Sequence, residues 1–85
     1  MQVLDFAWLR ERIGLGAETV DLPAGVTTVS GLVAFLAGRS AGHAAAFAPD
    51  TAGLVRCAVN QVFAQPDWPV GPGDEVAFFP PVTGG

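Results

Sequence analysis

One amphipathic helix in the middle of the chain constrains the fold more than any other feature of the sequence. Its apolar residues recur at the spacing of one helical face, at Val29, Leu32, Val33 and Leu36. Thr28 stands directly before them and is a favourable N-cap, because its hydroxyl can accept a hydrogen bond from a free amide of the first turn. A chain of 85 residues buries a single modest core. We therefore expect the rest of the domain to pack on this helix.

Segments rich in apolar and β-branched residues flank the helix on both sides and predict strands. Before the helix we expect a strand over residues 3–7, a helical turn over residues 8–13 and a strand over residues 17–22. After the helix we expect a short helix over residues 43–48 and three strands, over residues 54–59, 62–63 and 75–79. This order indicates an α+β fold, in which a mixed sheet of about five strands wraps on one main helix. A small barrel of five short strands is the alternative, and the strong helix argues against it.

Alternation within the strands predicts which side chains face the core. We expect Asp5 on the solvent side of the first strand, and Glu18 on the solvent side of the second, opposite Val20. The adjacent phenylalanines of the last strand must point to opposite faces, and a single helix covers only one face. We therefore expect Phe79 outside the core, as an anchor for docking to another protein. Burial of both rings, the second one against loops, is the alternative.

Composition and charge argue against several functions. The net charge is −4 and the chain has four arginines but no lysine, so we expect no nucleic-acid binding and no lysine-based chemistry. The single cysteine, Cys57, excludes an intramolecular disulfide, and we expect it in the core. His43 has no cysteine or second histidine nearby in sequence, so we expect no metal site. Asn60 is expected to form or tie a turn, and no catalytic constellation is apparent.

The amino-terminal residues and the apolar runs predict the compartment. The first residues do not show a basic region followed by an apolar stretch, so we expect no secretory signal. No apolar run approaches the roughly 18 residues that a membrane-spanning helix needs, so we expect no membrane partner. These observations predict a cytoplasmic protein.

The sequence closes on a proline pair followed by a small terminus: Pro80, Pro81, Val82, Thr83, Gly84 and Gly85. The prolines favour an extended backbone. The two glycines leave the carboxylate of Gly85 unhindered. We expect a domain over residues 1–79 and an extended tail over residues 80–85 that enters the active site of another protein. A frayed or truncated end is the alternative explanation for the two glycines.

Several segments of the chain resemble the MoaD-like branch of the ubiquitin-like sulfur carriers, which are small subunits of molybdopterin synthase. They are Phe6-Ala7 with Arg10-Glu11, Val59-Asn60-Gln61, the run from Gly73 to Pro81, and the final Val82-Thr83-Gly84-Gly85. Asp5 stands where many relatives carry an apolar residue, and the lack of lysine is unusual. The resemblance covers essentially the whole chain and implies a β-grasp fold.

The resemblance also implies a mechanism for the tail. A MoeB-like adenylating enzyme would use ATP and magnesium to activate the carboxylate of Gly85. A sulfur donor, such as a cysteine desulfurase or a rhodanese, would convert it into a thiocarboxylate. The tail would then insert into the large synthase subunit, with Phe79 docking beside it, and pass sulfur to cyclic pyranopterin monophosphate. The resemblance implies a heterotetramer in which this subunit binds no cofactor of its own and is not an enzyme by itself.

Three other functions stay open at the level of the sequence. A carrier for thiazole or another sulfur-containing product would share the fold and the two glycines, although the segment Phe79-Pro80-Pro81 is not expected in it. A ubiquitin-like protein modifier would be joined to its targets through Gly85. An interaction module would use the domain alone and leave the tail idle.

Overall fold

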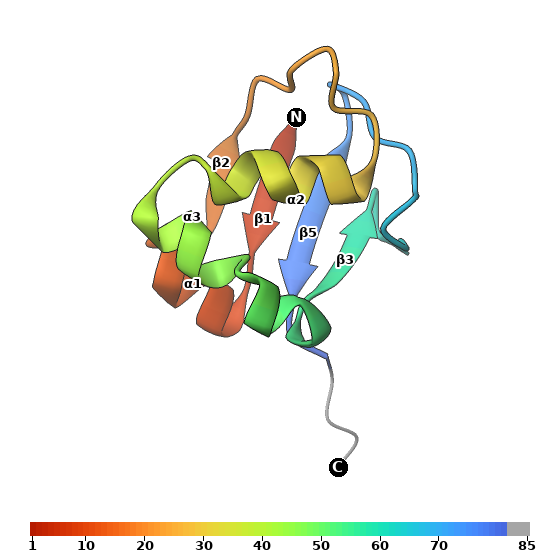
Figure 1. Ribbon diagram of the computed structural model, residues 1–85. Coiled ribbons are helices and arrows are strands. Elements are labelled where there is room, and N and C mark those ends of the chain that lie inside the picture. The colour runs from red at the N-terminus through yellow and green to blue at the C-terminus, as the bar shows by residue number, and fades with distance from the viewer. Residues whose placement is uncertain (82–85) are drawn as a thin grey trace.

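The first and last strands of the chain lie side by side at the centre of one sheet (Figure 1). The computed structural model describes residues 1–81. Its elements are β1 (Gln2–Asp5), α1 (Ala7–Ile13), β2 (Ala17–Thr19), α2 (Val29–Ala37), α3 (Ala41–Ala46), the 3-10 helix η1 (Pro49–Leu54), β3 (Arg56–Val59), β4 (Val62–Phe63) and β5 (Glu75–Phe79). The five strands are ordered β2-β1-β5-β3-β4, with β1 and β5 parallel and the other neighbours antiparallel.

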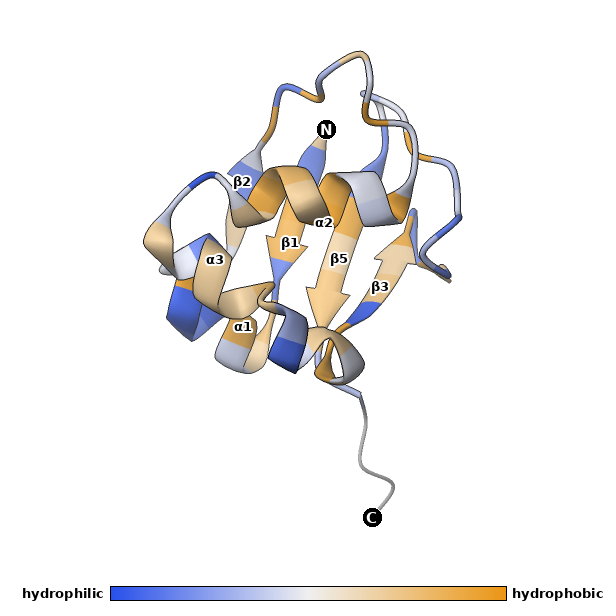
Figure 2. Ribbon diagram, in the orientation of Figure 1, coloured by the Kyte–Doolittle hydropathy of each residue, from blue (hydrophilic) through white to orange (hydrophobic). Residues whose placement is uncertain are grey.

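The expected central helix is present and carries the core. The Thr28 hydroxyl accepts a hydrogen bond from the amide of Gly31 at 3.2 Å, so the predicted N-cap is confirmed. The helix buries Val29, Leu32 and Leu36, which stabilises the fold by roughly 2 kcal/mol for each fully buried side chain. Figure 2 shows the apolar colour continuing from α2 onto the strands behind it. The sequence therefore predicted the mixed five-stranded α+β sheet on one main helix correctly.

A tight turn joins β3 to β4, as the sequence predicted. Asn60 and Gln61 both have positive φ, at 49° and 69°, which matches the twist of a two-residue hairpin. The side chain of Asn60 accepts from the Glu75 amide at 3.0 Å and donates to Asp74 at 2.9 Å. The hydrogen bond from Asn60 to Asp74, together with one from the Gly71 amide, lowers the pKa of the Asp74 carboxyl. Asn60 thus ties the hairpin to the start of β5.

Replacing Asn60 with alanine is expected to lower the free energy of unfolding by about 1–2 kcal/mol, because two hydrogen bonds are lost and a Cβ-bearing residue without a polar side chain must keep positive φ. Asn60→Gly is the matched control, since it loses the same hydrogen bonds but tolerates this backbone conformation. Urea denaturation of the three proteins separates the two contributions. Equal stability of Asn60→Ala and the original chain would show that the tie contributes nothing.

Strand boundaries differ from the prediction at three places. The first strand stops at Asp5, because the chain turns into α1 at Ala7, whose φ is +54°. The second strand stops at Thr19 instead of residue 22. Leu54 belongs to η1 and is 53% exposed, so the third strand begins only at Arg56.

The expected positions of two acidic side chains are wrong. Asp5 is 2% exposed and Glu18 is 8% exposed, whereas both were predicted on the solvent side. Asp5 lies two residues after buried Val3, and Glu18 two residues before buried Val20, so strand alternation turns both carboxyls inward. Glu18 is compensated there, because it lies 2.9 Å from His43 and 3.3 Å from Arg39. Asp5 has no such partner among residues 1–81.

Candidate functional site

The last strand presents one phenylalanine to each face of the sheet, as alternation predicted. Phe78 is fully buried and its ring meets that of Phe47 edge to face, with centroids 5.0 Å apart. Phe79 is partly exposed on the opposite face. Its ring lies 5.9 Å from that of Phe63, which is 79% exposed. The expectation that Phe79 lies outside the core is confirmed, and the structure adds Phe63 as its neighbour.

The strand register aligns further apolar side chains beside these two rings. One row runs across all five strands in the order Ala17, Leu4, Ala77, Ala58 and Phe63. The helices α2 and α3 lie on the other face of the sheet (Figure 1). We call this row, together with Phe79, the outer apolar surface. Exposed surfaces of this kind, with large aromatic side chains, are typical of protein–protein contacts.

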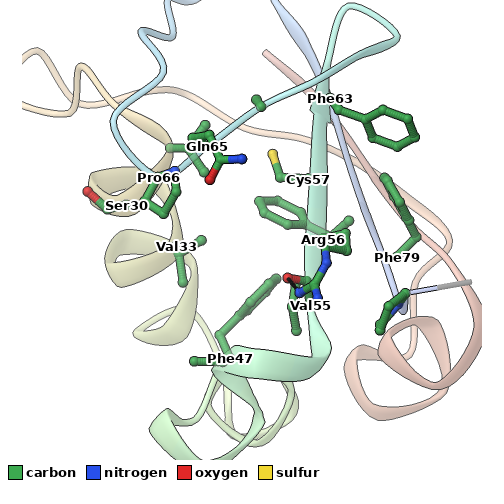
Figure 3. Close-up of a pocket in the computed structure, with 15 residues that line it drawn as sticks. Ser30, Val33, Phe47, Val55, Arg56, Cys57, Phe63, Gln65, Pro66 and Phe79 are labelled. Atoms are coloured by element: carbon green, nitrogen blue, oxygen red, sulfur yellow. Dashed lines mark hydrogen bonds between the residues drawn. The ribbon is translucent and has the colours of Figure 1, made fainter.

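An open cleft of about 920 Å³ adjoins the outer apolar surface at the β3 side of the sheet. In Figure 3, Val33 and Phe47 lie on the helix side of β3, and Phe63 and Phe79 on the far side. Pro81 also lines the cleft, and Arg56 supplies its positive charge. The cleft therefore connects the outer apolar surface with the point where the tail leaves the domain.

The sequence predicted Cys57 in the core, and this is confirmed. Its side chain faces the cleft from β3 (Figure 3), but the residue is only 8% exposed. Burial raises the pKa of the Cys57 thiol to about 11. The thiol therefore stays protonated at neutral pH, and the thiolate needed for nucleophilic sulfur chemistry is scarce.

The structure describes only the first two residues of the expected tail, Pro80 and Pro81. Strand β5 ends at Phe79, and Pro80 and Pro81 follow it without regular secondary structure. The predicted positions in Val82, Thr83, Gly84 and Gly85 lie outside the described residues. The division into a domain over residues 1–79 and a tail over residues 80–85 stays a prediction.

The remaining candidates are structural. His43 is buried, with Nδ1 2.7 Å from the Ser40 hydroxyl and Nε2 2.9 Å from Glu18.

Within residues 1–81, no group of three or more His, Cys, Asp or Glu side chains could hold a metal ion. In the same part of the chain, no helix is long and apolar enough to cross a membrane.

Comparison with known proteins identifies the class to which this fold and surface belong. The ThiS family matches residues 3–85. The chain is 42% identical to the molybdopterin synthase sulfur carrier subunit of Escherichia coli and 38% identical to that of Haemophilus influenzae. Each alignment covers the whole chain and 99% of the relative. The chain therefore belongs to the ThiS family of small carrier proteins, and it is not an enzyme by itself.

Solved structures agree with this assignment. SAMP1 from Haloferax volcanii superimposes with a TM-score of 0.75 at 30% identity, covering 100% of this chain and 98% of that one. A putative molybdopterin converting factor, subunit 1, from Pyrococcus furiosus gives a TM-score of 0.73 at 27% identity, covering 95% of each chain. The fold is thus the ubiquitin-like β-grasp that the resemblance implied.

Proposed function

We propose that this chain is the sulfur carrier subunit of a molybdopterin synthase. The observation that carries the proposal is its 42% identity, over its full length, to a protein of that name. The geometry is compatible with it, because β5 leads from a buried Phe78 through an outward Phe79 directly into the proline pair. The domain would present the tail and contribute no catalytic group. We place the protein in the cytoplasm.

The proposed chemistry takes place on the carboxylate of Gly85. A carboxylate is a poor electrophile, so a MoeB-like enzyme first transfers AMP to it from ATP, with magnesium, and pyrophosphate leaves. The terminal sulfur of a persulfide on a cysteine desulfurase or a rhodanese then displaces AMP and forms an acyl disulfide with the donor. A thiol reductant cleaves the S–S bond of this disulfide, which leaves the thiocarboxylate on Gly85 and oxidises the thiol. The sulfur of the thiocarboxylate is a better nucleophile near neutral pH than a carboxylate oxygen, and it would pass to cyclic pyranopterin monophosphate. Two such transfers would build the dithiolene of molybdopterin.

The proposed binding partner is the large synthase subunit, in a heterotetramer of two small and two large subunits. The outer apolar surface would dock on it, with Phe79 next to the tail that inserts. Pro80 and Pro81 would hold the first part of the tail extended, and Val82, Thr83 and Gly84 would reach into the partner. The large subunit would supply the cations and the acid–base groups, because this chain has net charge −4 and no lysine.

Intact mass spectrometry after incubation with an adenylating enzyme, ATP and a sulfur donor tests this proposal. We expect the protein to gain about 16 Da, because one oxygen of a carboxyl group is replaced by sulfur. Reaction of the product with cyclic pyranopterin monophosphate and the large subunit should return the original mass. A protein that never gains this mass, or that keeps it in the presence of substrate and large subunit, would contradict the proposal.

A second candidate function is protein modification, with Gly85 joined to lysines of other proteins. Its support is the superposition on SAMP1 from Haloferax volcanii at 30% identity. Another solved structure from the same organism spells this name out as small archaeal modifier protein 1. Immunoblots of the host proteome distinguish the two functions. A ladder of conjugates that disappears when Gly85 is deleted would favour modification, whereas one free band would favour the sulfur carrier alone.

A further inference from the structure

A network of ionisable side chains lies buried between β2 and α3, away from the outer apolar surface. Glu18 is 8% exposed and His43 5% exposed. The Nε2 atom of His43 lies 2.9 and 3.1 Å from the two carboxylate oxygens of Glu18. Arg39, which directly precedes the N-cap of α3, places its Nε atom 3.3 Å from the same carboxylate, and the Ser40 hydroxyl lies 2.7 Å from the other ring nitrogen of His43. The network therefore joins α3 to the sheet through a contact between two ionisable side chains, His43 of α3 and Glu18 of β2.

Asp5 extends this network but has no cationic partner. It is 2% exposed, and neither of its carboxylate oxygens has a hydrogen-bond partner among residues 1–81. Val3 stands opposite Glu18 in the register of β1 and β2, so Asp5, two residues further along the same face, is the diagonal neighbour of Glu18. Two ionised carboxylates cannot donate a hydrogen bond to each other, but one proton lets either carboxyl donate to the other.

We propose that Asp5 and Glu18 share one proton in the folded protein, and that this proton makes the contact of α3 with the sheet sensitive to pH. With the proton present, the negative charge of Glu18 faces Arg39, and Asp5 is a neutral donor. Without it, a second negative charge faces Glu18 in a site that excludes most solvent, and this costs free energy.

The charged groups near Asp5 come from β2, from α3 with the residues before it, and from α1. On β2 it faces Glu18, and from α3 and the residues before it come His43 and Arg39. On α1, the Arg10 side chain lies against Gly16, whose carbonyl accepts the Asp5 amide. Burial first, and then the charge of Glu18, raise the pKa of Asp5 from 3.8 to about 7.

The position of Asp5 connects this contact with the rest of the domain. Asp5 is in register with Phe78 in the central strand pair, and the next amide, that of Phe6, donates to the Phe78 carbonyl at 3.1 Å. On the other side, α3 packs so closely on α1 that the carbonyl of Arg12 leaves no room for a side chain at Gly42. Loosening of α3 would therefore reach α1 and the strand that carries the tail.

The sign of the pH effect follows from the raised pKa. The folded chain keeps the proton up to about pH 7, whereas an opened form releases it above about pH 4. Opening therefore releases a proton between these values, and the stability that the proton contributes falls as pH rises through this range. Above about pH 7 the effect levels off, because the folded form is then also ionised.

Two measurements on the full chain test the proposal. In an NMR titration, the Asp5 carboxyl carbon should titrate near pH 7, and a midpoint below about pH 5 would overturn the shared proton. By hydrogen exchange, the opening constant of α3 should rise about tenfold per pH unit between about pH 5 and 7, relative to Asp5→Asn at the same pH. Asp21→Asn, an equal change of charge at an exposed position, should behave like the original chain. Parallel pH profiles for Asp5→Asn and the original chain would overturn the role of Asp5.

Discussion

A chain that lacks Gly85 is expected to fold normally and to form no thiocarboxylate. Strand β5 ends at Phe79, so the deletion leaves the sequence of every described helix and strand unchanged. The deletion withdraws the terminal carboxylate by about 3.5 Å, which is the length of one extended residue. Gly85→Ala keeps the length but places a side chain beside the reacting carbonyl. Intact mass after incubation with the adenylating enzyme, ATP and a sulfur donor should show at least about 100-fold less thiocarboxylate for both variants.

The matched control for these variants is Thr83→Ala, which changes the same tail but keeps both terminal glycines. It should be converted into the thiocarboxylate at nearly the original rate, and all three variants should unfold at the same urea concentration as the original chain. Near-normal conversion of the deletion variant would show that the carboxylate of Gly85 is not the activated group. Conversion of the original chain together with loss in Thr83→Ala would instead indicate that the whole tail is recognised.

The local patterns of the sequence predicted those features of the fold that depend on neighbouring residues. The helix from Val29 was correct, because its spacing and its N-cap at Thr28 are both local signals. The turn at Asn60 and the opposite faces of Phe78 and Phe79 were correct for the same reason. The exact ends of the strands were less predictable. Leu54 is the last residue of η1 and is 53% exposed, although its apolar side chain had suggested the start of a strand.

The features that depend on pairing between distant segments were not predictable. Phe63 belongs to the candidate site only because its strand aligns it with Ala58, next to the strand that carries Phe79, and no pattern near Phe63 encodes that register. Asp5 was placed on the wrong side because a carboxyl is normally solvated, and its burial beside Glu18 overrides that preference. The one signal that could have revealed the burial of Asp5 is its spacing of two residues from Val3, which places both side chains on the same face of the strand.

Aspartate in place of Phe63 is expected to weaken binding of the large subunit by at least about 30-fold, or about 2 kcal/mol. Phe63 is 79% exposed, so the substitution leaves the core intact, but a buried charge would then lie in the middle of an apolar contact. Phe79→Ala should cost more than about 1 kcal/mol. Because the two rings are 5.9 Å apart, the effects of the two changes should not be additive. Titration calorimetry with the purified large subunit measures each affinity.

Leu15→Asp is the matched control for this experiment. It introduces the same charge at an apolar residue that is 49% exposed, but Leu15 lies in the connection between α1 and β2 and is not part of the outer apolar surface. Its affinity for the large subunit should stay within about twofold of the original. Equal affinities for Phe63→Asp and Leu15→Asp would place the interface on another face of the domain. A loss confined to Phe63→Asp and Phe79→Ala would instead locate it at the two rings beside the tail.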